Sequence, residues 1–322
     1  WMIFAVVTAL TAVIHFAVSK LFPRKQFKDI PMNDQRVISI FNSPKELNII
    51  DDIYNEETGA CGIPEFGTNV ARSKLVDTRP TTFSDLVKIN GLAHGTNVWE
   101  HNIADLVNIE GKKLKEVICC RDDIMLDLIK KGVDPVESFY IMESVRKGKS
   151  VKKDQESDMI KADVASWYID SCKKIKYLFP KAHAAAYTMM AYRVAWFKVY
   201  YPEFYYVSYF SLRCDAYEIE TMVKDSHKIL QRLNELLLKK KMKTAEKKEL
   251  DIIDTLEVCY EMTCRGYKIT NINLEKSLAK DFLVNPDNHK EIIPPFIVVD
   301  GLGEAVANKI VQEREKPFTS IQ

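Results

Sequence analysis

The sequence lacks the features that mark small secreted domains and structural zinc sites. Its seven cysteines are odd in number and show no paired CxxC spacing. This argues against a disulfide framework or a structural metal site, and it favours a reducing compartment. Glycine and proline are scarce, with 11 and 12 residues among 322, which is typical of a mostly helical protein. We therefore expect a mainly α, cytoplasmic chain that is long enough for about two domains.

The chain also lacks an excess of charge of either sign. Its formal net charge is +1, so no global basic field points to nucleic acid. Any nucleic-acid site must therefore be a local basic patch.

A long apolar run occurs once, at residues 2–22. The run reads MIFAVVTALTAVIHFAVSKLF, and Arg24 and Lys25 follow it. Its length fits a membrane span, whereas a signal peptide fits less well because no positively charged segment precedes it. A third interpretation is that the run is foreign to the rest of the chain, since a start at Trp1 suggests a fragment.

The rest of the chain is organised around residues 166–205, which read as two helices broken at Phe179-Pro180. Pro180 cannot continue the first helix, because it lacks an N–H and its ring clashes with the preceding turn. A second helix of about 20 residues is predicted from about residue 182 to 200, where Pro202 ends it.

The start of this second helix carries Lys181, His183 and Tyr187. His183 and Tyr187 are four residues apart and share one face. The alanines between them have small side chains, so that a flat ligand could approach the backbone there. Together with the positive end of the helix dipole, this pattern suits a phosphate and a base. The alternative is an ordinary packed helix with a structural histidine.

Two further stretches carry charge. In a helix predicted over 114–131, Arg121 is followed by Asp122 and Asp123, which point about 100° apart and are poorly placed to chelate one ion. We expect them to form a solvated face or to accept backbone N–H groups, and we predict no metal site. A basic loop surrounds Gly148 and can follow a phosphate backbone or be simply solvated; its cations are Arg146, Lys147, Lys149, Lys152 and Lys153.

After Pro202 the sequence pattern is less regular. A helical pair over 217–248 ends in the lysine run KKKMKTAEKK, which marks a plausible domain boundary. One more helix is predicted at 249–264, and short alternating runs over 265–300 suggest a small sheet.

The last motif is Gly301-Leu302-Gly303, between an apolar run and an amphipathic helix. This is the pattern of a helix-hairpin-helix unit, whose free N–H groups can bind a DNA phosphate, with Lys309 and Arg314 adding charge. It could also be any turn between helices. A GxGxxG loop is excluded, because Val306 stands where the third glycine is needed.

Taken together, the motifs resemble the alpha subunit of bacterial DNA polymerase III, of the PolC type found in low-GC Gram-positive bacteria. The resemblance covers roughly residues 29–322. The matching stretches are GIPEFGT (62–68), DTRPTTFSDLVKINGLAHGTNVW (77–99), CRDDIM (120–125), IMESVRKGK (141–149), WYIDSCKKIKYLFPKAHAAAY (167–187) and IPPF…GLG (293–303).

The resemblance implies a fingers domain at 29–215 and a small α+β, helix-hairpin-helix duplex-binding domain at 216–322, cut short at its end. Template-directed DNA synthesis from dNTPs, a nucleotidyltransfer in DNA replication, is the activity it implies for the parent protein. Nucleotide would be bound by Arg121, Pro180, Lys181, His183 and Tyr187. DNA would be bound by Arg146, Lys147, Lys149, Gly301, Gly303, Lys309 and Arg314.

The resemblance also implies groups that this sequence does not contain. The catalytic aspartates and their Mg²⁺ ions belong to a palm region upstream, so we expect no catalytic residue here and no primer extension by this chain alone. A sliding clamp and other replisome subunits are the implied partners, besides primer–template and dNTP.

The segment 1–28 has no counterpart in the resemblance, and we interpret it as a truncation or frameshift rather than a membrane anchor. Two alternatives stay open for the chain as a whole. It could be a stand-alone, non-catalytic DNA-binding module, or a membrane-tethered helical protein if residues 2–22 span a bilayer.

Overall fold

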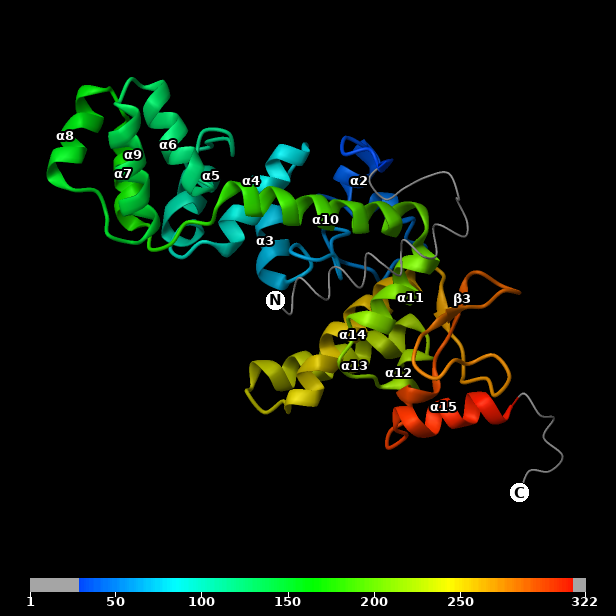
Figure 1. Cartoon of the computed structure of the whole chain (residues 1–322). Coiled ribbons are helices and arrows are strands. Elements are labelled where there is room, and N and C mark those ends of the chain that lie inside the picture. Colours follow the sequence, from blue (N-terminus) through cyan, green and yellow to red (C-terminus); the bar gives the residue numbers. More distant parts are fainter. Residues whose placement is uncertain (1–28, 315–322) are drawn as a thin grey trace. The chain divides into compact units, whose positions relative to one another are not determined.

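The computed structural model describes residues 29–314, and these form two compact units (Figure 1). Unit 1 consists of 29–31, 44–64 and 193–314, and unit 2 consists of 32–43 and 65–192. Helix α10 (Lys181–Tyr200) contributes its first part to unit 2 and its last part to unit 1. The segment 1–28 lies outside the described residues, and with it the apolar run.

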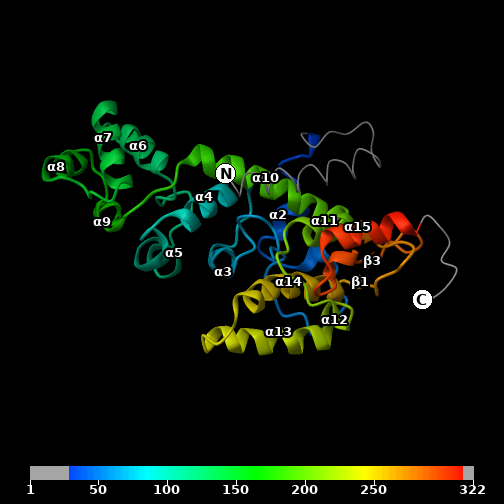
Figure 2. The same ribbon diagram turned by 60° about the horizontal axis from the view of Figure 1, so that its bottom comes forward.

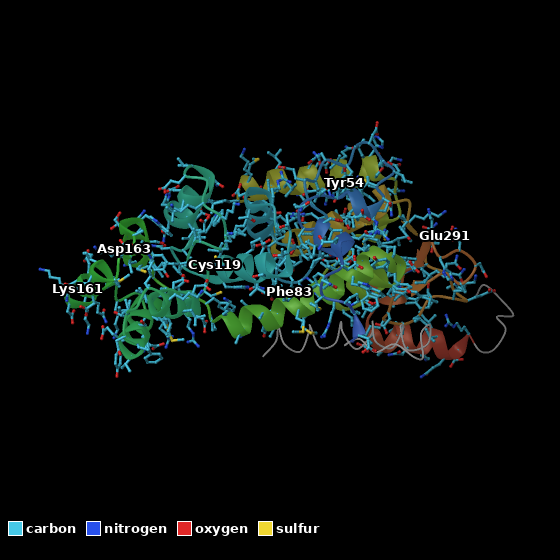
Figure 3. The ribbon with its side chains drawn as sticks, turned by 90° about the horizontal axis from the view of Figure 1, so that it is seen from above. Tyr54, Phe83, Cys119, Lys161, Asp163 and Glu291 are labelled. Atoms are coloured by element: carbon cyan, nitrogen blue, oxygen red, sulfur yellow. The ribbon has the colours of Figure 1, made fainter. Side chains whose placement is uncertain are left out.

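Unit 2 is built from helices. They are α2 (Gln35–Ser39), α3 (Asn69–Thr78), α4 (Phe83–His94), the π turn η3 (Trp99–Ile103), α5 (Ala104–Asn108), α6 (Arg121–Lys130), α7 (Pro135–Arg146), α8 (Lys153–Lys161), α9 (Ser166–Lys174) and the start of α10. Helices α6 and α7 pack against each other, as do α3 and α4. In Figure 3 the labelled Phe83 lies beside α10, where its ring packs edge-on against Tyr192.

Unit 1 combines helices with a small sheet. Its elements are η2 (Lys45–Leu47), the end of α10, α11 (Pro202–Leu212), α12 (Ile219–Met222), α13 (Ser226–Lys241), α14 (Lys247–Cys264), β1 (Lys268–Ile269), β2 (Leu283–Val284), β3 (Glu291–Ile293), η4 (Phe296–Val298) and α15 (Glu304–Glu313). The strand order is β1-β3-β2, with β1 parallel and β2 antiparallel to β3. Helices α13 and α14 lie side by side (Figure 2).

The core of unit 1 is rich in tyrosine. Tyr205 and Tyr206 of α11 are fully buried beside α14. Their hydroxyls find partners, because the Tyr205 hydroxyl donates to the Cys61 carbonyl and that of Tyr206 to Glu261. A buried phenol needs such an acceptor. The expected mainly helical architecture with a small sheet is confirmed.

Two predicted boundaries are wrong. The helix expected over 114–131 begins only at Arg121, because the backbone at Cys120 is extended. The first helix of the central stretch ends at Lys174, well before Pro180, because the following residues pair with Thr96 as a bridge instead. The predicted end of the second helix at residue 200, before Pro202, is confirmed by α10. Pro202 is then the first residue of α11, a position that suits proline.

The compact units also divide the chain differently from the boundary expected at residues 215 and 216. That position lies inside unit 1, since α11 packs against α14 and the sheet. Helix α15 follows Gly303 as expected, whereas the element before Gly301 is the short 3-10 turn η4 and not an α-helix. The functional domain assignment and the helix-hairpin-helix unit stay predictions.

Within residues 29–314, no helix combines the length and the apolar character that a bilayer crossing requires.

Candidate nucleotide and nucleic-acid interface

The starts of α6 and α10 are held together in unit 2. The backbone N–H of Arg121 donates to the carbonyl of Phe179 over 3.1 Å. In return, the carboxylate of Asp122 accepts the N–H of Lys181 over 2.7 Å. Residues far apart in sequence are thereby brought together, and Arg121, Pro180 and Lys181 lie at one place.

Asp123 completes this junction. Its carboxylate is almost buried, and it accepts the N–H groups of Cys119 and Cys120 over 3.1 and 2.9 Å. Its other oxygen accepts from the Lys181 ammonium over 3.1 Å, and Lys88 lies 3.9 Å away. Both aspartates therefore accept backbone N–H groups, which confirms that expectation for the pair.

Lys181 stays protonated at this junction. Partial burial acts to lower the pKa of Lys181, but the Asp123 carboxylate outweighs it, so that the net change in pKa is upward. The Lys181 side chain remains 41% exposed. A cation that is held by one carboxylate and still open to solvent can meet a second anion.

Four aromatic rings near the start of α10 form a continuous series of contacts. His183 stacks on Tyr187 with ring centroids 4.2 Å apart and planes 11° from parallel. Phe179 meets His183 edge-on at 4.8 Å, and His94 stacks on Phe179 at 4.8 Å. The predicted pairing of His183 and Tyr187 on one helix face is confirmed, and we call the four rings the ring file.

A carboxylate lies at the far end of the ring file. Glu65 Oε2 is 2.6 Å from Nε2 of His94 and 3.5 Å from the amide nitrogen of Asn90. Glu65 holds this position with a positive φ of 67°. Sequence reasoning missed Glu65 and Phe179 as members of this site, since no spacing rule links residue 65 to His94 at the end of α4.

The start of α10 has one buried face and one face exposed to solvent, and alanines lie on both. Ala184 is fully buried against Val87 and Cys120, whereas Ala182, His183 and Ala186 are exposed. Small side chains therefore surround His183 on the solvent side. A flat group could approach this face closely, as the sequence predicted.

The basic loop after α7 is folded against the segment that leads to Pro180. Gly148 has a φ of 70°, and a Cβ there would stand 2.6 Å from the Lys176 carbonyl. The N–H of Leu178 faces the Arg146 carbonyl at 3.4 Å. The structure thus brings this loop next to the approach to α10.

Two cations of the loop already have a partner. Glu143 pairs with Arg146 and, over 2.9 Å, with Lys147. The hydrogen bond from Arg146 is the main reason that the pKa of Glu143 falls to about 2. Lys149 is exposed and has no ion pair among residues 29–314.

We expect Glu143→Gln to strengthen binding of a primer–template duplex by about two- to fivefold. The substitution frees two cations from an exposed pair, which is worth up to about 1 kcal/mol. Fluorescence anisotropy of labelled duplex at fixed salt measures the effect. The control is Asp158→Asn, which removes the same charge from another pair on an exposed helix, with Lys161 at 3.0 Å. Equal gains in both variants would show a net-charge effect and no role for the loop.

The glycine turn before α15 belongs to unit 1. Gly301 has a φ of 79°, and neither Gly301 nor Gly303 has a heavy atom within 4 Å of an added Cβ. No side chain caps α15 at Gly303, so that its first N–H groups are open to an acceptor. Lys309 is exposed, but Arg314 donates to the Ser277 carbonyl over 2.5 Å, which ties up part of its guanidinium.

Residues 29–314 contain no group of three or more His, Cys, Asp or Glu side chains placed to hold a metal ion.

Comparison with known proteins identifies the family. A family model described as the bacterial DNA polymerase III alpha subunit finger domain matches residues 7–166. The match includes Arg121 and the basic loop, ends before α10, and begins inside the apolar run that the motif resemblance left out. The separate origin proposed for residues 1–28 therefore stays a prediction.

Relatives extend the similarity over nearly the whole chain. A DNA polymerase III PolC-type of Mycoplasmopsis pulmonis is 50% identical over 300 residues, which are 92% of this chain and 21% of the relative. Those of Staphylococcus saprophyticus and Staphylococcus aureus are 47% identical over 294 residues, 91% of this chain and 20% of each relative. The chain spans about a fifth of the length of the relatives it matches, and it belongs to the bacterial DNA polymerase III alpha subunit family, among the PolC-type members.

Proposed function

We propose that this chain is the part of a replicative DNA polymerase that positions the incoming nucleotide and holds the primer–template. The junction of α6 and α10 carries the proposal. It brings Arg121 and the protonated Lys181 together at the start of a long helix, whose first turns also carry His183 and Tyr187 of the ring file. Cations next to stacking surfaces suit a nucleoside triphosphate, which has an anionic and an aromatic end.

The proposed roles follow from the charge and the position of each group. The Lys181 ammonium and the Arg121 guanidinium, although each is near a carboxylate, would bind the triphosphate, with support from the N–H groups of α10 that follow that of Lys181. Pro180 fixes where the helix starts. His183 and Tyr187 would present a flat surface to the nascent base pair.

DNA would meet two other surfaces of the chain. We assign the template backbone to Arg146, Lys147 and Lys149, and duplex behind the primer end to the turn at Gly301 and Gly303 with Lys309 and Arg314. Phosphate contacts of this kind position a duplex without reading its sequence.

The joining of nucleotide to primer we assign to the palm of the parent polymerase. Mg²⁺ would there neutralise the developing charge of phosphoryl transfer. The sliding clamp and the rest of the replisome would likewise be partners of the parent protein. The competing function is a non-catalytic DNA-binding module, in which nucleotide has no effect on binding.

Nucleotide dependence separates the two functions. We expect a dNTP complementary to the template to tighten binding of primer–template to this chain, measured by anisotropy. Lys181→Ala should weaken the dNTP effect about tenfold or more, because a hydrogen bond to a charged group is worth about 1.5–3 kcal/mol. Lys130→Ala, an exposed lysine of α6, is the control and should change nothing.

The result that would contradict the proposal is equal duplex binding with and without dNTP. In that case the chain would be the DNA-binding module alone.

A further inference from the structure

The turn between α13 and α14 carries a cluster of cations that the proposed function does not use. We call residues 238–247 the hairpin tip. In Figures 1 and 2 it is the end of the yellow helix pair at which a turn joins the two helices. The tip contains five lysines and one acidic residue, Glu246, and residues 238–244 are all exposed. The lysines are Lys239, Lys240, Lys241, Lys243 and Lys247.

Two acidic side chains at the base of the tip are engaged in ion pairs, whereas the carboxylate of Glu246 lies in the tip itself and is exposed. Glu249 pairs with Lys239 over 2.5 Å, and Asp300 pairs with Lys248 over 2.9 Å. Among residues 29–314, four of the five tip lysines, Lys240, Lys241, Lys243 and Lys247, are left without an ion-pair partner. The chain as a whole carries a net charge of only +1, so this is a strong local concentration of charge.

Helix stability explains only the lysines in the last turn of α13, which include Lys240 and Lys241. Cations in the last turn of α13 complement the negative end of its dipole, but Lys243 lies beyond that turn. Lys247 is the first residue of α14, where a positive charge opposes the dipole. The charge is therefore arranged for something outside the hairpin.

The tip is also held in one conformation. The N–H of Met242 donates to the Leu238 carbonyl, and that of Thr244 to the Lys239 carbonyl, over 2.9 and 3.0 Å. Lys243 adopts a left-handed φ of 58° to close the turn. A preformed array of cations loses little backbone freedom when it binds a partner.

The position of the tip links it to the glycine turn before α15. The ion pair of Lys248 with Asp300 joins the start of α14 to the residue that precedes Gly301. We propose that the hairpin tip is a second contact with the sugar–phosphate backbone of the duplex, continuous with the Gly301–Gly303 turn. This inference rests on the proposed function and names a DNA-contacting surface that it did not include.

The test measures how binding depends on salt. Each lysine that neutralises a phosphate adds about 0.9 to the slope of log K against log salt concentration. We expect the triple variant Lys240→Gln, Lys241→Gln and Lys243→Gln of the full 322-residue chain to bind labelled primer–template with a slope smaller by about 2 to 3. Its circular dichroism and melting temperature should match those of the unsubstituted chain.

A matched variant controls for net charge. Lys130→Gln, Lys131→Gln and Lys161→Gln change three lysines of unit 2 that pair with aspartates, and the slope should stay unchanged. An equal fall in both variants would overturn the inference, as would an unchanged slope in the tip variant, which leaves the proposed function standing. No duplex binding by the unsubstituted chain would overturn both. Binding of phosphatidylglycerol vesicles that depends on the tip lysines, with an unchanged DNA slope, would assign the tip to a lipid surface and overturn the inference.

Discussion

Lys198→Ala is expected to lower the free energy of unfolding of unit 1 by about 3–5 kcal/mol, the usual result of removing one partner of a buried ion pair. Lys198 has no exposed surface, and its ammonium lies 2.7 Å from a carboxylate oxygen of Glu261, which is 1% exposed. It also donates to the carbonyls of Gly59 and Cys61. The substitution would leave the Glu261 charge without its cation and would remove the Lys198 donor from both carbonyls, of which that of Cys61 keeps the Tyr205 hydroxyl.

The surroundings of this pair explain why the loss should be large. Glu261 accepts hydrogen bonds from Tyr206 and Tyr54 over 2.9 and 3.2 Å, and Arg265 donates to the Tyr206 hydroxyl. Burial lowers the pKa of Lys198, and the attraction to Glu261 opposes that change. A buried polar network in which every donor and acceptor has a partner stabilises the fold. The same network with a partner missing lowers the free energy of unfolding.

Urea denaturation followed by far-ultraviolet circular dichroism measures the effect. Lys224→Ala, an exposed lysine of the same unit, should stay within about 0.5 kcal/mol of the unsubstituted chain. Replacing both charges, as in Lys198→Met with Glu261→Leu, should recover part of the loss, because an apolar pair leaves no stranded charge. A Lys198→Ala chain as stable as the Lys224→Ala control would refute the importance of the pair.

Asp123→Ala is expected to destabilise unit 2 by about 3 kcal/mol. The N–H groups of Cys119 and Cys120, which are both buried, would lose their acceptor, at about 1–3 kcal/mol each. Lys181 would lose its anchor at the same time. Asp123→Asn is the matched variant, since it keeps one oxygen to accept an N–H, and it should lose less.

The cysteines themselves report on this change. Burial raises the pKa of Cys120 to about 12, and it also raises the pKa of Cys119 well above its usual value, so both thiols should be inert in the unsubstituted chain. If Asp123→Ala loosens the start of α6, a thiol reagent should label the 119–120 peptide faster, as mass spectrometry would show. Unchanged labelling together with unchanged stability would mean that Asp123 does not hold the junction.

The sequence was informative wherever a local rule decides the structure. Proline chemistry located the start of α10 near Pro180, and the four-residue spacing put His183 and Tyr187 on one face. The small sheet followed from the short alternating runs after residue 265.

Contacts between distant residues were not predictable in the same way. No rule of spacing joins Asp123 to Lys181 or Glu65 to His94, because these pairs exist only once the helices have packed. Lys198 shows the same limit, since a lysine near the end of a helix reads as solvent-exposed until its buried partner Glu261 is known. The early end of α9 had a similar cause, because a distant strand-like bridge at Thr96 took the place of its last turn.

At Glu65, a substitution that stabilises the fold would remove a contact of the ring file. A left-handed backbone at a residue other than glycine costs about 1 kcal/mol, so a laboratory selection for heat resistance would favour glycine or asparagine at this position. Either replacement would take away the carboxylate that meets His94 at the end of the ring file. A library ranked by melting temperature alone would therefore enrich chains whose ring file has lost its anchor.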